Sequence, residues 1–82
     1  MARQREVSSD ELEEFVRQVF DELELIYETI VEECLTAQAE GHQWLEVHLR
    51  GGETIELEMS GNGHGRQRLR EALARAIKAK LH

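Results

Sequence analysis

The sequence predicts a small α+β domain of two layers with the element order α-β-β-α. Three patterns support this fold class: a helical apolar stripe that begins near residue 9, an alternation of period two over residues 43–59, and a second helical stripe after residue 65. A chain of 82 residues has room for one hydrophobic core, so residues 1–82 are expected to form a single domain.

The first helix is predicted over residues 9–40. Ser8 is the expected N-cap, with Glu11 completing a capping box and Val7 contacting Leu12 as a hydrophobic staple. Apolar residues then recur at spacings of four and three, at Leu12, Val16, Val19, Leu23, Ile26, Ile30 and Cys34. Gly41 is the expected left-handed residue beyond the helix end. A helix of this length extends about 48 Å, which is long for so small a domain.

An antiparallel hairpin is predicted next, with strands at 43–49 and 53–59. Its apolar residues alternate and share one face: Leu45, Val47, Leu49, Ile55, Leu57 and Met59. Since apolar residues must pair with apolar residues, the numbers of paired residues must sum to an even value. This predicts a three-residue turn at 50–52 with a left-handed Gly52, and it pairs Val47 with Ile55.

The last helix is predicted over residues 65–81, with Leu69, Leu73, Ile77 and Leu81 on its apolar face. Charge divides the chain sharply, because Glu6 to Ser60 hold 16 acidic and two basic residues, whereas Gly61 to His82 hold six basic and one acidic. The net charge of −7 repels a polyanion. We therefore interpret the basic helix as lying near the acidic helix, within one chain or across a dimer, rather than on nucleic acid.

A homodimer is expected from the same elements. A lone two-stranded hairpin is marginally stable, its open edges invite further pairing, and the long helix extends beyond the strands. Joining two hairpins, pairing two helices, or both would complete the fold. The candidate interface residues are Phe15, Val19, Leu23, Ile26, Tyr27 and Trp44.

The glycine-rich segment before the last helix is a candidate anion site. Backbone N–H groups at a helix start attract anions, and nearby arginines would strengthen the contact. The segment lacks the Lys-Ser/Thr pair of a P-loop and the third glycine of the dinucleotide fingerprint. The alternative is a connection that needs unusual backbone angles. The candidate anion-binding residues are Gly61, Gly63, Gly65, Arg66, Arg68 and Arg70.

No other pattern predicts catalysis, a cofactor or a metal. His48 lies among Glu46, Glu56 and Glu58, but metal-ligand spacing is missing and cross-strand pairs on a solvated face explain the cluster. Cys34 falls on the apolar stripe and is interpreted as a core residue. Trp44 shares the polar face of the hairpin, either as an interface or ligand contact or packed over the helix end.

The expected location is cytoplasmic. No apolar run is long enough to span a membrane and no secretory signal is present, so the chain is expected to be soluble with no membrane partner. One cysteine allows no internal disulfide, which suits a reducing compartment. No specific small molecule is implied.

Residues 61–73, GNGHGRQRLREAL, resemble the glycine loop and following helix of small-MutS-related domains. The matching positions are Gly61, Gly63, Gly65, Leu69, Arg70 and Leu73. The chain lacks that family's Leu-Asp-x-His-Gly strand. The resemblance implies a nucleic-acid-binding or nuclease role.

The whole chain is similar in style to de novo designed α/β proteins. Shared features are the capping box, the absence of proline, and helices rich in Ala, Glu, Arg and Lys. This resemblance implies that the fold or assembly is the purpose of the chain. We therefore expect a structural, self-associating homodimer without enzymatic activity. The alternative is a small phosphate- or RNA-binding module.

Overall fold

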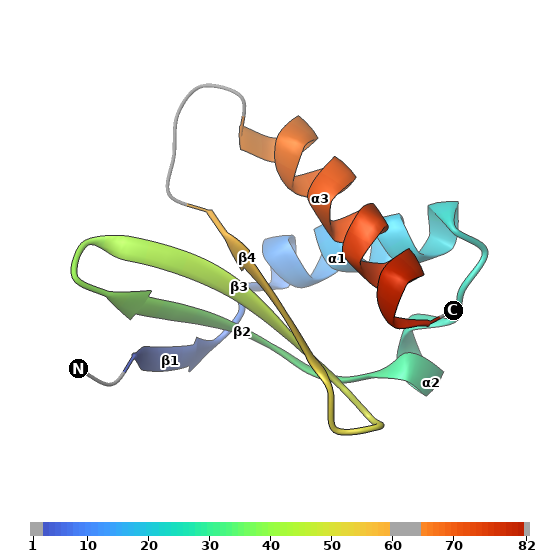
Figure 1. Ribbon diagram of the computed structural model, residues 1–82, viewed down its shortest axis with the longest axis horizontal. Coiled ribbons are helices and arrows are strands. Elements are labelled where there is room, and N and C mark those ends of the chain that lie inside the picture. The colour runs from blue at the N-terminus through green and yellow to red at the C-terminus, as the bar shows by residue number, and fades with distance from the viewer. Residues whose placement is uncertain (1–2, 60–64, 82) are drawn as a thin grey trace.

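The structure is a computed structural model that describes residues 3–59 and 65–81. Along the chain it contains β1 (Gln4–Val7), α1 (Asp10–Glu22), α2 (Tyr27–Ile30), β2 (Val31–Ala39), β3 (His42–Leu49), β4 (Thr54–Glu58) and α3 (Gly65–Lys80). The strands form one antiparallel sheet in the order β1-β2-β3-β4. Helices α1 and α3 lie on the same side of this sheet (Figure 1). The α+β class is confirmed, with a four-stranded sheet in place of a two-stranded hairpin.

The hydrophobic core fills the space between the two helices and the sheet. Helix α1 supplies the largest group of side chains because its apolar positions recur every three or four residues. The buried core residues are Leu12, Phe15, Val16, Val19, Phe20, Tyr27, Val31, Cys34, Leu45, Val47, Leu49, Ile55, Leu73 and Ile77. No residue of β1 belongs to this core.

The predicted helix over residues 9–40 is wrong, because α1 ends at Glu22. Glu24 adopts the left-handed conformation, with φ 61°. The Leu25 N–H donates to the Phe20 carbonyl at 2.9 Å, and the Glu24 N–H donates to the Asp21 carbonyl at 3.0 Å. These two bonds form a Schellman motif, in which glycine is the usual left-handed residue. A glutamate there leaves no sequence signal for the helix end.

The segment that forms β2 was predicted as helix because Cys34 lies four residues after Ile30 and so continues the apolar stripe of α1. Val31, Cys34 and Ala37 are all buried. Val31 and Cys34 face the core, and an irregularity between Val31 and Glu33 shifts the register between them. Ala37 pairs with Trp44 and is buried on the opposite face. The bulge and the burial on both faces interrupt the simple alternation by which a strand is recognised from sequence.

The start of α1 also differs from the prediction. Ser9 is the N-cap and its Oγ accepts from the Leu12 N–H at 3.2 Å. Ser8 instead stays with the sheet, because its N–H donates to the Cys34 carbonyl at 3.1 Å. Val7 is 73% exposed and forms no staple. Strand β1, which the sequence analysis did not predict, therefore runs almost directly into α1.

The hairpin prediction is confirmed in register and turn. Val47 pairs with Ile55, the Leu49 N–H donates to the Glu53 carbonyl at 2.8 Å, and Gly52 has φ +95°. The strands span 42–49 and 54–58 instead of 43–49 and 53–59. Gly41 is left-handed, with φ +80°, but it joins β2 to β3 in a two-residue turn instead of ending a helix. Helix α3 ends one residue before the predicted limit.

Candidate functional site

The open face is the side of the sheet opposite α1 and α3. Because side chains alternate along a strand, the polar residues of β3 and β4 point to this side while their apolar neighbours point to the core. The open face is defined by Arg3, Arg5, Ala37, Trp44, Glu46, His48, Thr54 and Glu56. Neither α1 nor α3 covers it (Figure 1).

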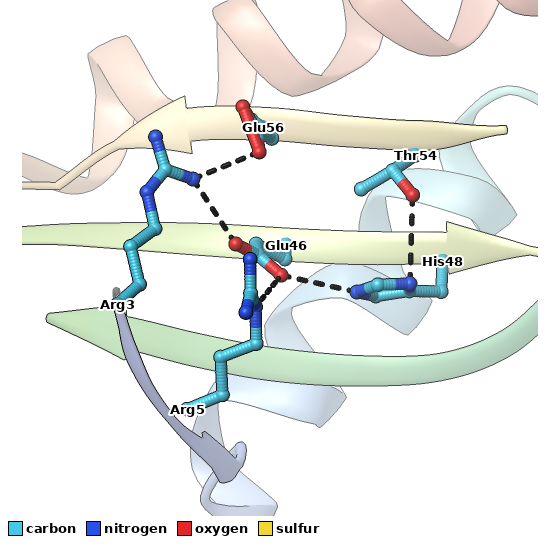
Figure 2. Close-up of polar contacts among 6 residues, drawn as sticks. All are labelled: Arg3, Arg5, Glu46, His48, Thr54 and Glu56. Atoms are coloured by element: carbon cyan, nitrogen blue, oxygen red, sulfur yellow. Dashed lines mark hydrogen bonds and ion pairs between the residues drawn. The ribbon is translucent and has the colours of Figure 1, made fainter. Parts of the chain in front are cut away.

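A buried carboxylate lies at the centre of the open face. Glu46 is only 1% exposed, although no helix packs over it. Figure 2 shows Arg3 and Arg5 extending from the N-terminal edge of the sheet across β2 to reach it. Arg5 Nε lies 2.8 Å from Glu46 Oε1, and Arg3 Nη1 lies 3.1 Å from Glu46 Oε2. Each carboxylate oxygen therefore accepts from a different guanidinium group, and the two arginines cover the charge.

Arg3, which directly precedes β1, connects β3 and β4 through one guanidinium group. Its Nη1 also lies 2.8 Å from Glu56 Oε2 on β4. The Arg3 guanidinium carbon lies 4.1 Å from the ring centroid of Trp44, which is a cation–π contact. Trp44 is thus a half-buried residue of the open face and does not pack over a helix end.

His48 completes the cluster. Its Nε2 lies 3.1 Å from Glu46 Oε1, and its Nδ1 lies 3.4 Å from Thr54 Oγ1. Burial acts to raise the pKa of Glu46, but hydrogen bonds from Arg5, His48 and Arg3 outweigh burial and lower that pKa below its usual value. Glu46 is consequently ionised at neutral pH.

In this geometry a buried carboxylate binds two arginine side chains. The carboxylate that could act as a base is already engaged by two guanidinium groups. Among residues 3–59 and 65–81, no group of three or more His, Cys, Asp or Glu side chains is placed to hold a metal. What the open face does hold is an extended strand with arginines at alternate positions.

The residues predicted to bind an anion lie in different environments. Arg66 Nη2 lies 3.1 Å from Glu11 Oε1, and Arg70 Nη1 lies 2.5 Å from Glu22 Oε2. Arg68 is exposed and Gly65 is the first residue of α3. Gly61 and Gly63 lie outside the described residues. Two of the arginines therefore face carboxylates of α1 in the same chain, as the charge pattern predicted.

Most of the predicted dimer residues are part of the core of the single chain. Phe15, Val19 and Tyr27 are buried there, and the partly buried Leu23 packs against the same core. Ile26 is 63% exposed. The apolar stripe of the supposed long helix thus has its cover within one chain, and pairing of long helices loses its structural basis.

Cys34 is a core residue, as predicted. Its Sγ lies 3.2 Å from the hydroxyl oxygen of Tyr27, with both groups buried. Burial raises the pKa of the Cys34 thiol, which keeps it protonated and poorly nucleophilic.

Comparison with protein-family models, with curated proteins and with solved structures finds no match to this chain. Within the described parts of the chain, no helix has the length and apolar character needed to cross a membrane.

Sequence reasoning missed Arg3 and Arg5, on which the cluster depends. Their spacing of two was the available signal, because residues two apart point to the same side of an extended strand. The outward-facing Trp44, Glu46, His48 and Glu56 were correctly grouped by alternation.

Proposed function

We propose that this chain is a non-catalytic, self-associating α+β protein, and that the contact between copies is built on its N-terminal edge strand β1. One observation carries the proposal: all four residues of β1 are exposed, and among residues 3–59 and 65–81 the strand has a partner, β2, on one side only. An edge strand of this kind presents unpaired backbone N–H and C=O groups to other chains. Val7, at 73% exposure, adds an apolar side chain to the same edge.

The opposite edge of the sheet is less suited to this role. Strand β4 carries Glu56 and Glu58. Antiparallel pairing of two β4 strands about a two-fold axis at Glu56 would place like charges directly opposite each other, which is destabilising. The homodimer predicted through the hairpin edge is therefore reassigned to β1.

The absence of an enzymatic role is supported by the state of the most buried ionisable group on the open face. Glu46 is held by Arg3, Arg5 and His48, so its oxygens are not available to accept a substrate proton. A chain whose purpose is its fold and assembly, as the resemblance to designed proteins implies, fits this proposal.

Light scattering across protein concentration tests the proposal. From about 5 μM to 500 μM the weight-average mass is expected to rise from the 9.5 kDa of one chain toward twice that value. A mass that stays at one chain over the whole range would overturn self-association.

A second candidate function, phosphate or RNA binding, is favoured by one feature of α3. Arg68, Arg75 and Lys78 are exposed on one side of the helix, at spacings of seven and three. Within the described residues these three form no ion pair, in contrast to Arg66 and Arg70. The glycines Gly61 and Gly63 of this candidate lie outside the described residues.

Titration with single-stranded RNA at about 50 and 200 mM salt tests this candidate. Binding should weaken with salt and disappear when Arg68, Arg75 and Lys78 are replaced by Ala. Replacement of Arg66 and Arg70, which already pair with glutamates, is the matched control and should weaken binding less. No binding at the lower salt concentration would exclude the candidate.

A further inference from the structure

Strand β1 is held by contacts that a second copy of the chain can reproduce. Its residues add nothing to the hydrophobic core. Its attachment consists of backbone pairing with β2 and the ion pairs of Arg3 and Arg5 with Glu46 and Glu56. These ion pairs join residues 41 to 53 positions apart in the chain. None of them depends on the covalent connection between β1 and the rest of the molecule.

Arg3 and Arg5 stabilise the Glu46 carboxylate. Their guanidinium groups cover it and pair with both of its oxygens, so their removal would expose the carboxylate and cost two charge-assisted hydrogen bonds. The open face therefore selects for an extended segment with two arginines spaced by two, whichever chain supplies it. Residues 3–7 of this sequence have that pattern.

The hinge between β1 and α1 is short and buries a hydroxyl group that lacks a hydrogen-bond partner among the described residues. Only Ser8 and Ser9 separate the strand from the helix. Ser8 is 6% exposed, and its hydroxyl oxygen is buried with no hydrogen-bond partner among the described residues. A buried hydroxyl without a partner destabilises the conformation that buries it. Opening the hinge would release this hydroxyl to solvent. A short hinge that is destabilised in the closed chain favours exchange of the element beyond it.

We propose that two copies of the chain associate by exchanging β1. Residues 3–7 of each copy would pair with β2 of the other and place Arg3 and Arg5 on that copy's Glu46, Glu56 and Trp44. This inference rests on the proposed self-association through β1, and it replaces edge-to-edge pairing with exchange of the strand. Exchange preserves every contact of β1, so the balance between the closed chain and the exchanged dimer depends on the hinge and on protein concentration.

Disulfide trapping between two different single-cysteine chains tests the exchange. One chain, labelled with ¹⁵N, carries Val7→Cys and the other carries Leu35→Cys, both with Cys34→Ala. Val7 lies directly opposite Leu35. Because the next pair along, Ser8 with Cys34, is hydrogen-bonded, Val7 and Leu35 form a non-hydrogen-bonded pair. Such pairs have Cα atoms about 4.5 Å apart, a separation that a disulfide can bridge.

The two chains are mixed at about 500 μM, equilibrated and oxidised with oxidised glutathione, and the products are identified by mass spectrometry. Exchange predicts a mixed-label covalent dimer linked between residues 7 and 35. A matched control replaces the Leu35 variant by Gln18→Cys, an exposed position on α1, and should give at least about tenfold less mixed-label dimer.

A single chain that carries both Val7→Cys and Leu35→Cys distinguishes failure of the exchange proposal from failure of self-association. If light scattering shows a dimer but every 7–35 disulfide forms within one chain, exchange is wrong and self-association stands. If the protein remains a single chain at every concentration, both proposals are wrong.

Ser8→Ala provides a further check. It removes the unpartnered hydroxyl and so stabilises the closed chain. The dissociation constant of the exchanged dimer should therefore rise at least about threefold. An unchanged or tighter dimer would contradict the role given to the hinge.

Discussion

At the scale of single residues, the carboxylate of Glu46 connects the sheet's edge strand to its centre. It is 1% exposed, and the side chains of Arg3, Arg5 and His48 all lie within hydrogen-bond distance. Hydrogen bonds to charged groups are stronger than those between neutral groups. Glu46→Gln keeps the shape but removes the charge, so it should lower the free energy of unfolding at pH 7 by about 1.5–3 kcal/mol. Urea denaturation measures this change.

The effect of Glu46→Gln should depend on pH. The pKa of Glu46 is lowered in the folded chain, because its hydrogen bonds outweigh burial. Its stabilising contribution is therefore complete above the unfolded value of about 4.3, and it is lost as the pH falls through the lowered folded pKa. The difference between the two proteins should shrink below about pH 4. Glu58→Gln is the control, since Glu58 pairs with His42 at a half-exposed site and should cost under about 0.5 kcal/mol. An equal loss in both variants would show that burial of Glu46 is immaterial.

At the scale of elements, the end of α1 includes a residue in an unfavourable backbone conformation. Glu24 has φ 61°, a conformation that costs an L-residue with a Cβ about 1–2 kcal/mol. Glu24→Gly should therefore stabilise the chain by about 0.5–1 kcal/mol, after the greater entropy of glycine in the unfolded state is subtracted. Gln18→Gly, at an exposed position inside the same helix, should destabilise by about 0.5–1 kcal/mol. Thermal or urea unfolding should show changes of opposite sign in the free energy of unfolding of the two variants. Changes of the same sign would contradict the assigned helix end.

The elements that sequence reasoning predicted are those whose periodicity has a single cause. Strands β3 and β4 alternate because one face meets the core, and the even-sum rule then determined their register. Strand β2 could not be distinguished from helix, because Cys34 continues the helical spacing of Ile26 and Ile30, while a bulge after Val31 and burial of Ala37 on the open face interrupt the alternation of the strand. Strand β1 is four exposed residues without alternating hydrophobicity. The roles of Arg3 and Arg5 depend on the placement of β1 beside β2, so their part in the candidate site could not be predicted.

At the scale of the whole molecule, opposite charges are separated along the chain and brought together by folding. Helices α1 and α3 are joined by the Glu11–Arg66 and Glu22–Arg70 ion pairs. Both pairs are exposed, and pairs of this kind contribute little to stability. A net charge of −7 remains, and its self-repulsion opposes the compact state. Electrostatic interactions in the molecule as a whole are therefore repulsive on balance, whereas those that attach β1 to the sheet are attractive.

This opposition predicts two salt responses in one protein. Raising NaCl from about 20 to 300 mM should increase the global free energy of unfolding by a few tenths of a kcal/mol, because screening weakens the repulsion among acidic residues. The same change should weaken the attachment of β1, which depends on Arg3 and Arg5 near their carboxylates. Hydrogen exchange at low protein concentration separates the two effects. The β1 amide of Glu6, whose residue pairs with Thr36, should exchange faster as salt rises, whereas core amides such as that of Val47 should exchange more slowly. If both amides respond in the same direction, β1 opens only with the whole molecule, and its ion pairs do not govern its attachment.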